Sequence, residues 1–392
     1  MSPMNLNVTL PGYRIIRWKS NLLMRVHVEA LEAPRHCPCC EGGRLRSKGR
    51  YERRVRHLAC FGLPSELVIA CRRYRCVDCG RTFVQPLPGI LPGQHSTQPW
   101  RESIYERHDD GICASRLAHR ERLGEATVSR IYAQFTQRKA RERQSLDCPF
   151  ALGIDEHTLH RGQRFATPFC DLKNRRVFDI CPGRSETELV GFLRSLKGRE
   201  KVRVVCIDLS PSYRALVRRW FPRALIVADR FHAVRLVGVH LMRLARQFVP
   251  ALGWNRTWLA LLRRRACRLE PAQQRRLQDL LAKHPALQGL YEMKERLCAL
   301  LGLKTQTAKA CRRHIHQLLE LIDQLRDSGL EAAVALAKTL SDWTEEIVRM
   351  WRFSRNNAVT EGFHRKMKLI QRRAYGFRSF TNYRLRVLAQ CG

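Results

Sequence analysis

Short apolar runs separated by polar turns fill the middle of the chain and predict β-strands. The runs Phe150–Asp155, Phe165–Leu172 and Arg176–Ile180 each have the length and composition of a short strand. Three such runs in succession, with only turns between them, predict neighbouring strands of one sheet.

The pattern then alternates between helix and strand. Ser185 is followed three residues later by Glu188, which is the spacing of a capping box and predicts that a helix starts here. Continuous apolar runs downstream predict strands covered on both faces, each followed by a helix. These strands are Val202–Asp208 and Ala224–Asp229, and their helices are Pro211–Phe221 and Phe231–Phe248. This order predicts a mixed sheet flanked by helices.

Outside this region the chain changes character several times. We therefore predict six segments. They are an N-terminal segment (1–33), a cysteine-rich module (34–90), a helical region (95–145), the first part of the α/β core (148–248), an α-helical insertion (249–350) and the C-terminal part of the core (351–392).

The net charge of the chain narrows the class of partner that it can bind. The chain has 72 Lys and Arg against 35 Asp and Glu, a formal net charge of +37. This excess favours nucleic acid as the partner, although ribosomal and packaging proteins share it. No apolar run has the eighteen or so residues of a membrane span, and Met1–Leu10 lacks the features of a secretory signal. We therefore expect a cytoplasmic protein with no membrane partner.

Two cysteine pairs predict a structural zinc site. Cys37 and Cys40, and again Cys76 and Cys79, are separated by two residues, a spacing that lets two thiolates from one turn bind the same tetrahedral ion. Cys39 competes with Cys37 or Cys40 as a ligand. The alternative is that these residues are reduced cysteines packed without metal.

Residues 112–132 have the pattern of a helix-turn-helix. Gly124 lies where the turn between the two helices is needed, and Thr127, Ser129 and Arg130 lie near the start of the second helix. In a DNA-binding helix-turn-helix these positions contact base edges. An ordinary helical hairpin is the alternative interpretation.

Three acids are placed where metal-dependent chemistry on DNA would need them. Asp155 and Asp208 each end a predicted strand, and Glu361 lies in a basic segment predicted to be helical. Carboxylates brought together in this way can hold Mg²⁺ (or Mn²⁺) for phosphoryl transfer. The alternatives are turn or cap residues for the two Asp side chains, and an ion pair with Arg365 for Glu361.

Further polar residues accompany the acids. Glu156 is expected to point to the opposite face from Asp155, because side chains alternate along a strand. Asp229 and His232 follow the last predicted strand, where they either orient the site or act only as a helix cap and a surface histidine.

Taken together, the motifs resemble the DDE transposases of bacterial insertion sequences, most closely the ISL-three branch. The cysteine-rich module and residues 112–132 resemble that branch's zinc-binding module and helix-turn-helix. Gly153–Glu156, Cys206–Tyr213 and Asp229–His232 resemble successive catalytic motifs, and Asn357–Gly362 with Arg373–Arg378 resembles its C-terminal signature.

The resemblance implies a fold and a mechanism. The fold class is α/β: an RNase H-like mixed sheet with flanking helices and an α-helical insertion, preceded by a small zinc-binding module and a helix-turn-helix domain. Asp155, Asp208 and Glu361 would be the catalytic metal-binding triad, with Asp229 and His232 supporting it or Asp229 replacing a ligand. Candidate DNA contacts are Thr127, Ser129, Arg130, Arg372, Arg373 and Arg378.

The expected function is a DNA transposase that binds terminal inverted repeats, cleaves DNA strands and joins them to target DNA. Its partners would be double-stranded DNA and a second copy of the chain, as a homodimer or higher oligomer on the bacterial nucleoid. Two alternatives are a DNA-binding regulator that uses the sheet as a scaffold and a structure-selective DNA nuclease.

Overall fold

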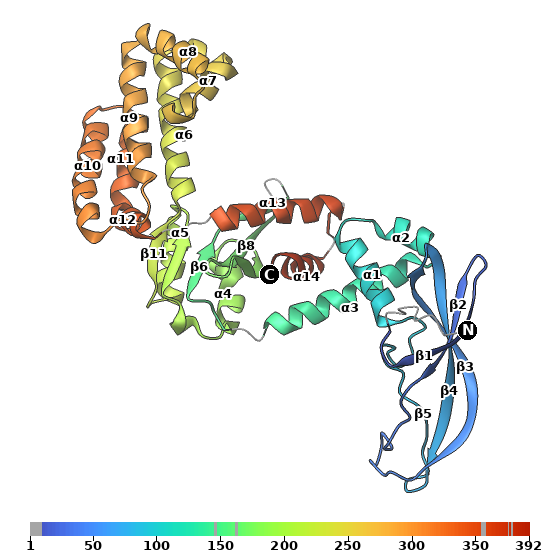
Figure 1. Ribbon diagram of the computed structural model, residues 1–392. Helices are drawn as coiled ribbons and strands as arrows, with labels where there is room; N and C mark the ends of the chain where they lie inside the picture. Colours follow the sequence, from blue (N-terminus) through green and yellow to red (C-terminus); the bar gives the residue numbers. More distant parts are fainter. Residues whose placement is uncertain (1–9, 145–146, 161–163, 354–357, 375, 378) are drawn as a thin grey trace. The chain divides into compact units, whose positions relative to one another are not determined.

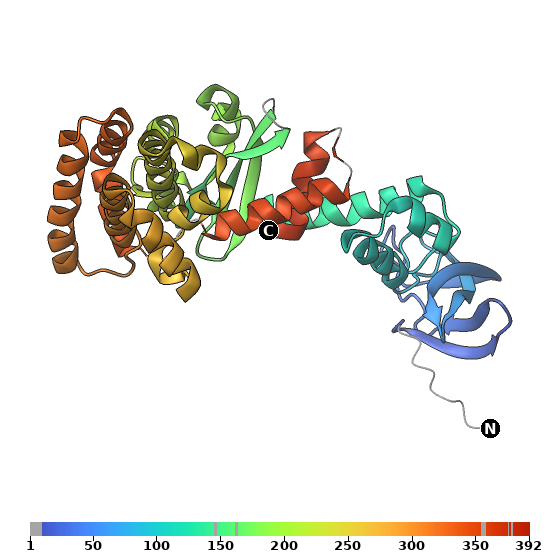
Figure 2. The same ribbon diagram turned by 90° about the horizontal axis from the view of Figure 1, so that it is seen from above.

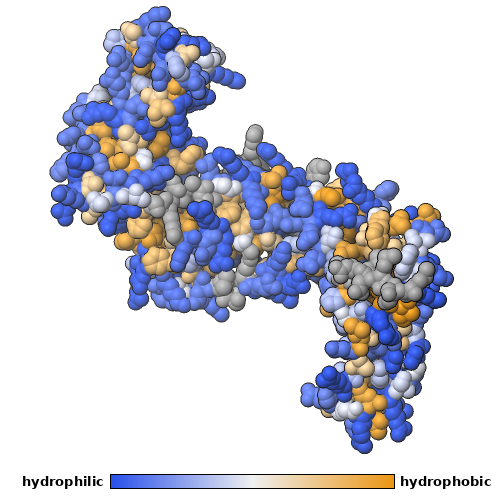
Figure 3. Space-filling view, in the orientation of Figure 1, coloured by the Kyte–Doolittle hydropathy of each residue, from blue (hydrophilic) through white to orange (hydrophobic). Residues whose placement is uncertain are grey.

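The chain divides between Arg138 and Lys139 into two structural units, which are described separately (Figures 1 and 2). The computed structural model describes residues 10–144, 147–160, 164–353, 358–374, 376–377 and 379–392. The face seen in Figure 3 is mostly hydrophilic on both units, as the excess of charged residues requires.

A five-stranded sheet forms the first part of the N-terminal unit, in the order β1-β2-β4-β3 with β5 paired to β4. Its core contains Val28, Leu67 and Ile69, which are fully buried. The long β3 and β4 pair as an antiparallel hairpin whose open end carries the cysteine pairs. The strands are β1 (Tyr13–Lys19), β2 (Met24–Ala30), β3 (Leu45–Cys60), β4 (Leu63–Cys76) and β5 (Thr82–Val84).

Three helices follow: α1 (Gln98–Asp109), α2 (Ala114–Glu121) and α3 (Glu125–Gln144). Thr97 caps α1 by accepting a hydrogen bond from the backbone N–H of Trp100. Apolar residues of all three helices form a second small core, with Ile104, Leu117 and Ile131 at its centre.

The second unit is built on a six-stranded mixed sheet, in the order β11-β10-β6-β8-β7 with β9 paired to β8. The strands β6, β10 and β11 are parallel, while β7 and β9 run antiparallel to β8. The strands are β6 (Ala151–Ile154), β7 (His157–His160), β8 (Arg164–Asp171), β9 (Arg176–Pro182), β10 (Val204–Ile207) and β11 (Leu225–Ala228).

The mixed α/β fold predicted from the sequence is confirmed. Each of the five predicted apolar runs is a strand, and the capping box of Ser185 and Glu188 is formed at the start of α4. The pattern did not predict β7, because His157–His160 is short and mostly polar.

Helices pack on the sheet and project from it (Figure 1). Those that follow strands are α4 (Glu186–Ser195), α5 (Pro211–Trp220) and α6 (Arg230–Phe248). From Pro250 to Arg352 every element is helical. These elements are α7 (Arg256–Arg263), α8 (Pro271–Ala282), α9 (Pro285–Leu301), α10 (Ala308–Asp327), α11 (Glu331–Asp342), α12 (Thr344–Arg352) and the 3-10 turns Pro250–Trp254 and Ala266–Arg268.

Hydrogen bonds attach α12 to the two helices that follow β10 and β11. Arg214 on α5 donates through Nε to Glu346 on α12 at 2.8 Å, and Arg230 at the start of α6 donates to the carbonyl oxygen of Met350 at 2.8 Å. Because Arg230 directly follows Asp229, the second bond also fixes the turn between β11 and α6.

The chain then returns to the sheet through α13 (Ala358–Arg373) and α14 (Phe380–Cys391). Arg384 on α14 makes two hydrogen bonds of 2.7 Å to the carboxylate of Asp179 on β9. A paired, bidentate contact of this kind fixes orientation as well as distance. The C-terminal helix is therefore held at a defined position beside β9.

Candidate active site and zinc centre

Three Asp side chains meet at one edge of the sheet of the second unit. Asp155, Asp208 and Asp229 each directly follow one of the parallel strands β6, β10 and β11. The register pairs the last residues of these neighbouring strands, and the N–H of Asp229 donates to the carbonyl oxygen of Ile207 at 2.7 Å. The carboxyl ends of parallel strands share an edge, and in open α/β sheets this is where ligands bind.

Asp155 is buried at this edge beside the other two acids. Burial raises the pKa of Asp155 to about 7, and the charges of Asp208 and Asp229 act in the same direction. The backbone N–H of Glu156 donates to its Oδ1 at 2.7 Å, which partly stabilises the ionised form. A bound cation would stabilise the ionised carboxylate, because it offsets the free-energy cost of burying the negative charge.

His232, in the first turn of α6, lies between two of the acids. Its Nε2 atom is 3.9 Å from Oδ2 of Asp155 and 3.7 Å from Oδ2 of Asp229. Ligand atoms of these three residues all lie within 4.8 Å of one another, close enough to share one ion. Asp229 also caps α6 by accepting from the N–H of Phe231 at 2.9 Å, so the cap and the cluster coexist.

Asp208 completes the edge. Burial raises its pKa, and the charges of Glu156 and Asp229 add to the effect. Its Oδ1 atom is buried and has no hydrogen-bond partner among the described residues. A buried acceptor of this kind is costly unless something binds it, and a divalent cation fits both its charge and its oxygen chemistry.

Glu156 follows Asp155 beyond the end of β6, which stops at Ile154. Its carboxylate pairs with Arg184 at 3.3 Å, and its charge raises the pKa of Asp208. Its predicted orientation toward the opposite face from Asp155 stays a prediction.

Glu361 lies near the start of α13 and approaches the cluster through a neighbour. It accepts a hydrogen bond from Arg365 at 3.1 Å, and its side chain is 38% exposed. Three residues later on the same face of the helix, Nδ1 of His364 lies 3.8 Å from Oδ2 of Asp155. Among the described residues, neither Glu361 nor Asp208 belongs to the group whose ligand atoms lie within 4.8 Å.

Three residues of this site were missed by sequence reasoning: His157, His364 and Tyr383. The Tyr383 hydroxyl lies 3.0 Å from Nε2 of His157, and the rings of His157 and His364 are 5.3 Å apart between centroids. Burial lowers the pKa of His364 to about 4 and that of His157 to about 3, so both rings are neutral at pH 7. The one signal available was the three-residue spacing of Glu361 and His364.

The residues fit a divalent metal. Asp155, Asp208 and Asp229 supply the oxygen ligands that Mg²⁺ prefers, and His232 and His364 border them. Nε2 of His364, like Oδ1 of Asp208, is buried and has no hydrogen-bond partner among the described residues. The arrangement can therefore hold one or more cations at this edge of the sheet.

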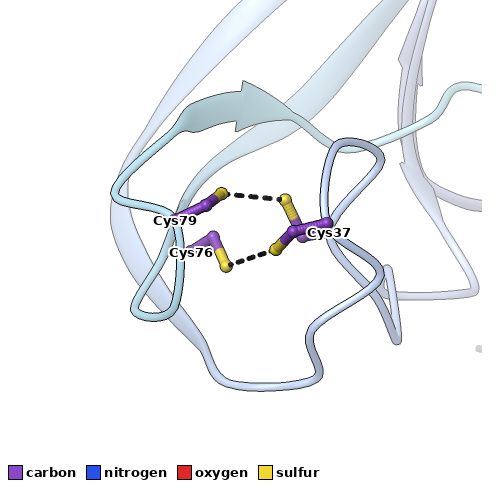
Figure 4. A group of neighbouring side chains, drawn as sticks. Cys37, Cys76 and Cys79 are labelled. Carbon is purple, nitrogen blue, oxygen red and sulfur yellow. Dashed lines mark hydrogen bonds between the residues drawn. The ribbon is translucent and has the colours of Figure 1, made fainter.

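A second cluster lies in the first unit. The thiols of Cys37, Cys40, Cys76 and Cys79 lie within 4.8 Å of one another, and Figure 4 shows those it labels pointing toward a common centre. The Sγ atoms of Cys37 and Cys79 are 3.7 Å apart, and those of Cys40 and Cys76 are 3.6 Å apart. This geometry supports a structural zinc, since four thiolates leave no open position.

Backbone geometry explains which cysteines take part. The N–H groups of Cys39 and Cys40 lower the pKa of the Cys37 thiol to about 7, which favours the thiolate that binds metal. Gly80 has a φ of 73°, as the tight turn after the second pair requires. Cys39 lies outside the cluster, where its sulfur accepts a hydrogen bond from Arg81 at 3.1 Å.

The helix-turn-helix pattern corresponds to α2 and α3. Ser129 and Arg130 are exposed on α3 and Thr127 is half-buried, while Val128 is buried in the helical core. The residue in the left-handed conformation is Arg122 (φ 52°), the C-cap of α2, whereas Gly124 has no positive φ. Further along the chain, Arg372 and Arg373 are exposed in the last turn of α13, and Arg378 lies outside the described residues.

Comparison with known proteins identifies the class. The sequence model of the ISL-three (ISL3) DDE family, described as Transposase, matches residues 152–387, and one described as the zinc-finger of transposase IS204/IS1001/IS1096/IS1165 matches residues 33–79. The chain belongs to the ISL-three family of insertion-sequence transposases, as the resemblance predicted.

A curated relative agrees with this assignment. The chain is 28% identical over 359 residues to the transposase for insertion sequence element IS1001 from Bordetella parapertussis, and the match covers 86% of this chain and 84% of the relative. No helix in the part of the chain that the structure describes is long and apolar enough to cross a membrane.

Proposed function

We propose that this protein cleaves DNA at the ends of its insertion sequence and joins the freed 3′-hydroxyl to target DNA. The observation that carries the proposal is the meeting of Asp155, Asp208 and Asp229 at one sheet edge, in a chain of this family. Asp155, Asp208 and Glu361 are the proposed catalytic residues, with Mg²⁺ or Mn²⁺ as the cofactor.

The chain's own residues prepare this site. Bound divalent cations would activate the attacking oxygen and stabilise the leaving oxygen of an in-line displacement. Asp155 loses its proton when a cation binds, because the cation replaces the proton's neutralising charge. Asp208 offers its free Oδ1 atom, and His232 holds the carboxylates of Asp155 and Asp229 in place.

Asp229 and Glu361 have different proposed roles. Asp229 already lies within 4.8 Å of Asp155 and His232 through its ligand atoms, which supports it as a supporting or substitute ligand. Glu361 would help to hold the cation through its carboxylate, which otherwise accepts a hydrogen bond from Arg365. His364 keeps this end of α13 next to Asp155.

DNA recognition is assigned to the first unit and to α13. We propose that the zinc-binding module (34–90) and the helix-turn-helix region (95–145) together bind the terminal inverted repeats. Ser129, Arg130 and Thr127 would contact base edges, and Arg372 and Arg373 would contact phosphates. Two ends must be held for joining, so we propose a homodimer or higher oligomer acting on DNA of the bacterial nucleoid.

The segments predicted from the sequence then have distinct proposed roles. Residues 148–248 and 351–392 would form the catalytic core, and residues 249–350 would be an accessory insertion. The helical character of Pro250–Arg352 and its hydrogen bonds to α5 and α6 support this division.

The test is a strand-transfer assay. Purified protein is given Mg²⁺, a duplex with one terminal repeat taken from the DNA flanking the coding sequence, and a naked target plasmid. We expect joined products from the wild type and none from Asp155→Ala, with end binding retained. Asp323→Ala is the matched control, because this Asp is exposed on α10 and far from the sheet edge in sequence.

Each alternative gives a different result. Cleavage without joined products would identify a nuclease, and binding of the repeats without cleavage would identify a regulator. Full cleavage by Asp155→Ala would show that this side chain has no part in catalysis.

A further inference from the structure

A cavity of about 440 Å³ lies between the β8–β9 region and the C-terminal helices. Its volume is within the range of small-ligand sites. Aromatic and cationic side chains line much of it, and the proposed chemistry uses none of them. The residues that matter most are Phe165, Phe377, Phe380, Tyr383, Arg164 and Arg184.

Two short chains of contacts join this cavity to Asp155. Tyr383 bonds to His157, the His157 ring lies 5.3 Å from that of His364 between centroids, and Nδ1 of His364 lies 3.8 Å from Oδ2 of Asp155. On the other side, Arg184 pairs at 3.3 Å with Glu156, the residue next to Asp155. A group held in the cavity is therefore only a few side chains from the reacting phosphate.

The walls of the cavity offer flat surfaces. The rings of Phe377 and Phe380 lie 5.2 and 6.0 Å from the ring of Tyr383, and both are only half-buried. The guanidinium of Arg184 lies 4.0 Å from the centre of the Phe165 ring. Aromatic faces and guanidinium planes are the groups on which nucleobases stack.

The charge and the rigidity of the cavity wall also suit a nucleotide. Arg164 and Arg184 are both exposed at the cavity and suit a phosphate. The acid in the lining, Glu188, is already engaged by Ser185 in the capping box of α4. Tyr383 is almost fully buried, and Arg384 next to it is fixed on Asp179, so the aromatic wall is preformed.

We propose that this cavity receives one unstacked nucleobase of the DNA next to the cleaved phosphate, with the backbone of that nucleotide held by Arg164 and Arg184. The proposal rests on the proposed function, because it assumes that DNA lies against the acidic cluster. Unpairing a base costs a few kcal/mol, and stacking on an aromatic wall offsets much of that cost.

Binding of modified DNA by cavity variants tests the proposal directly. Dissociation constants are measured without divalent cations, in the Asp155→Ala background, for duplexes of the terminal repeat that each lack one base near the cleavage site. We expect Phe380→Leu to weaken binding of intact DNA between about fivefold and a hundredfold, the equivalent of one stacked base. On the single duplex that lacks the captured base, the same variant should have no effect.

Controls separate stacking from misfolding. Phe377→Leu provides a second variant on the same wall, and Phe150→Leu removes an exposed ring outside the cavity and should change nothing. The proposal is overturned if neither variant loses its effect on any of the duplexes, or if binding weakens equally on every duplex. Because the readout is binding, it remains valid even if the wild-type protein fails to cleave or join DNA.

Discussion

The Nδ1 atom of His364 lies 3.8 Å from the Oδ2 atom of Asp155, although one residue is on α13 and the other follows β6. This contact brings the start of α13, and with it Glu361, to the sheet edge where the other acids meet. His364 is therefore one of the contacts that connect the C-terminal part of this unit to the sheet.

We expect His364→Ala to raise the Mg²⁺ concentration needed for cleavage. Groups that support metal ligands typically contribute about 10- to 100-fold to metal affinity or activity. A Mg²⁺ titration of the cleavage rate measures the change, and His364→Asn, which keeps a polar side chain, should recover part of it. His316→Ala on the exposed face of α10 is the control, and an unchanged Mg²⁺ dependence in His364→Ala would contradict the role.

Asp155 should make the metal-free protein less stable as pH rises. Burial raises its pKa to about 7, so between about pH 4 and pH 7 the folded protein binds a proton that the unfolded chain has released. Stability therefore falls with rising pH through this window and stays reduced above it.

Asp155→Asn removes the free-energy cost of ionising this buried side chain above pH 7. In Mg²⁺-free buffer we expect the variant to melt at a higher temperature than the wild type at pH 8, by about 2–4 °C for each kcal/mol. The difference should shrink toward pH 5. Adding Mg²⁺ should stabilise the wild type more than the variant, and equal melting temperatures at both pH values would argue against a buried, protonated Asp155.

Substitutions at two neighbouring cysteines should have different effects on zinc binding. Cys40→Ser removes a thiol 3.6 Å from that of Cys76, and we expect it to lower bound zinc and to destabilise the first unit. Cys39→Ser changes an exposed thiol outside the cluster and should keep one zinc per chain. Zinc is measured by atomic absorption, and loss of zinc in both variants would mean that the ligand set includes Cys39.

Arg130 should contribute to recognition of the terminal repeats. We expect Arg130→Ala to weaken binding of the repeat by about 1–3 kcal/mol if it contacts a base edge, while binding of unrelated DNA changes less. Arg312→Ala, an exposed Arg on α10, is the matched control. An equal loss on repeat and unrelated DNA would assign Arg130 to a phosphate instead.

Much of the fold follows from local pattern. The continuous apolar runs around Val205 and Ile226 specify strands covered on both faces, and the spacing of Ser185 and Glu188 specifies a capped helix. The two-residue spacing within each cysteine pair likewise specifies a turn that presents two thiols. These features depend on residues close in sequence, so one chain is enough to predict them.

Other features depend on what lies across the sheet. The sequence left Cys39 open as a ligand, and only the turn from Cys37 to Gly42 places its sulfur outside the cluster. It also did not predict β7, which is a strand because it pairs with β8 and not because of its own composition.

The chain by itself therefore determined that a cationic protein presents acids at the ends of buried strands, because charge and apolar periodicity are written residue by residue. The tertiary structure decided which distant groups surround those acids: His364 and the aromatic cavity beside Tyr383. These neighbours come from segments far apart in sequence, and only long-range packing of helices on the sheet brings them within a few ångströms.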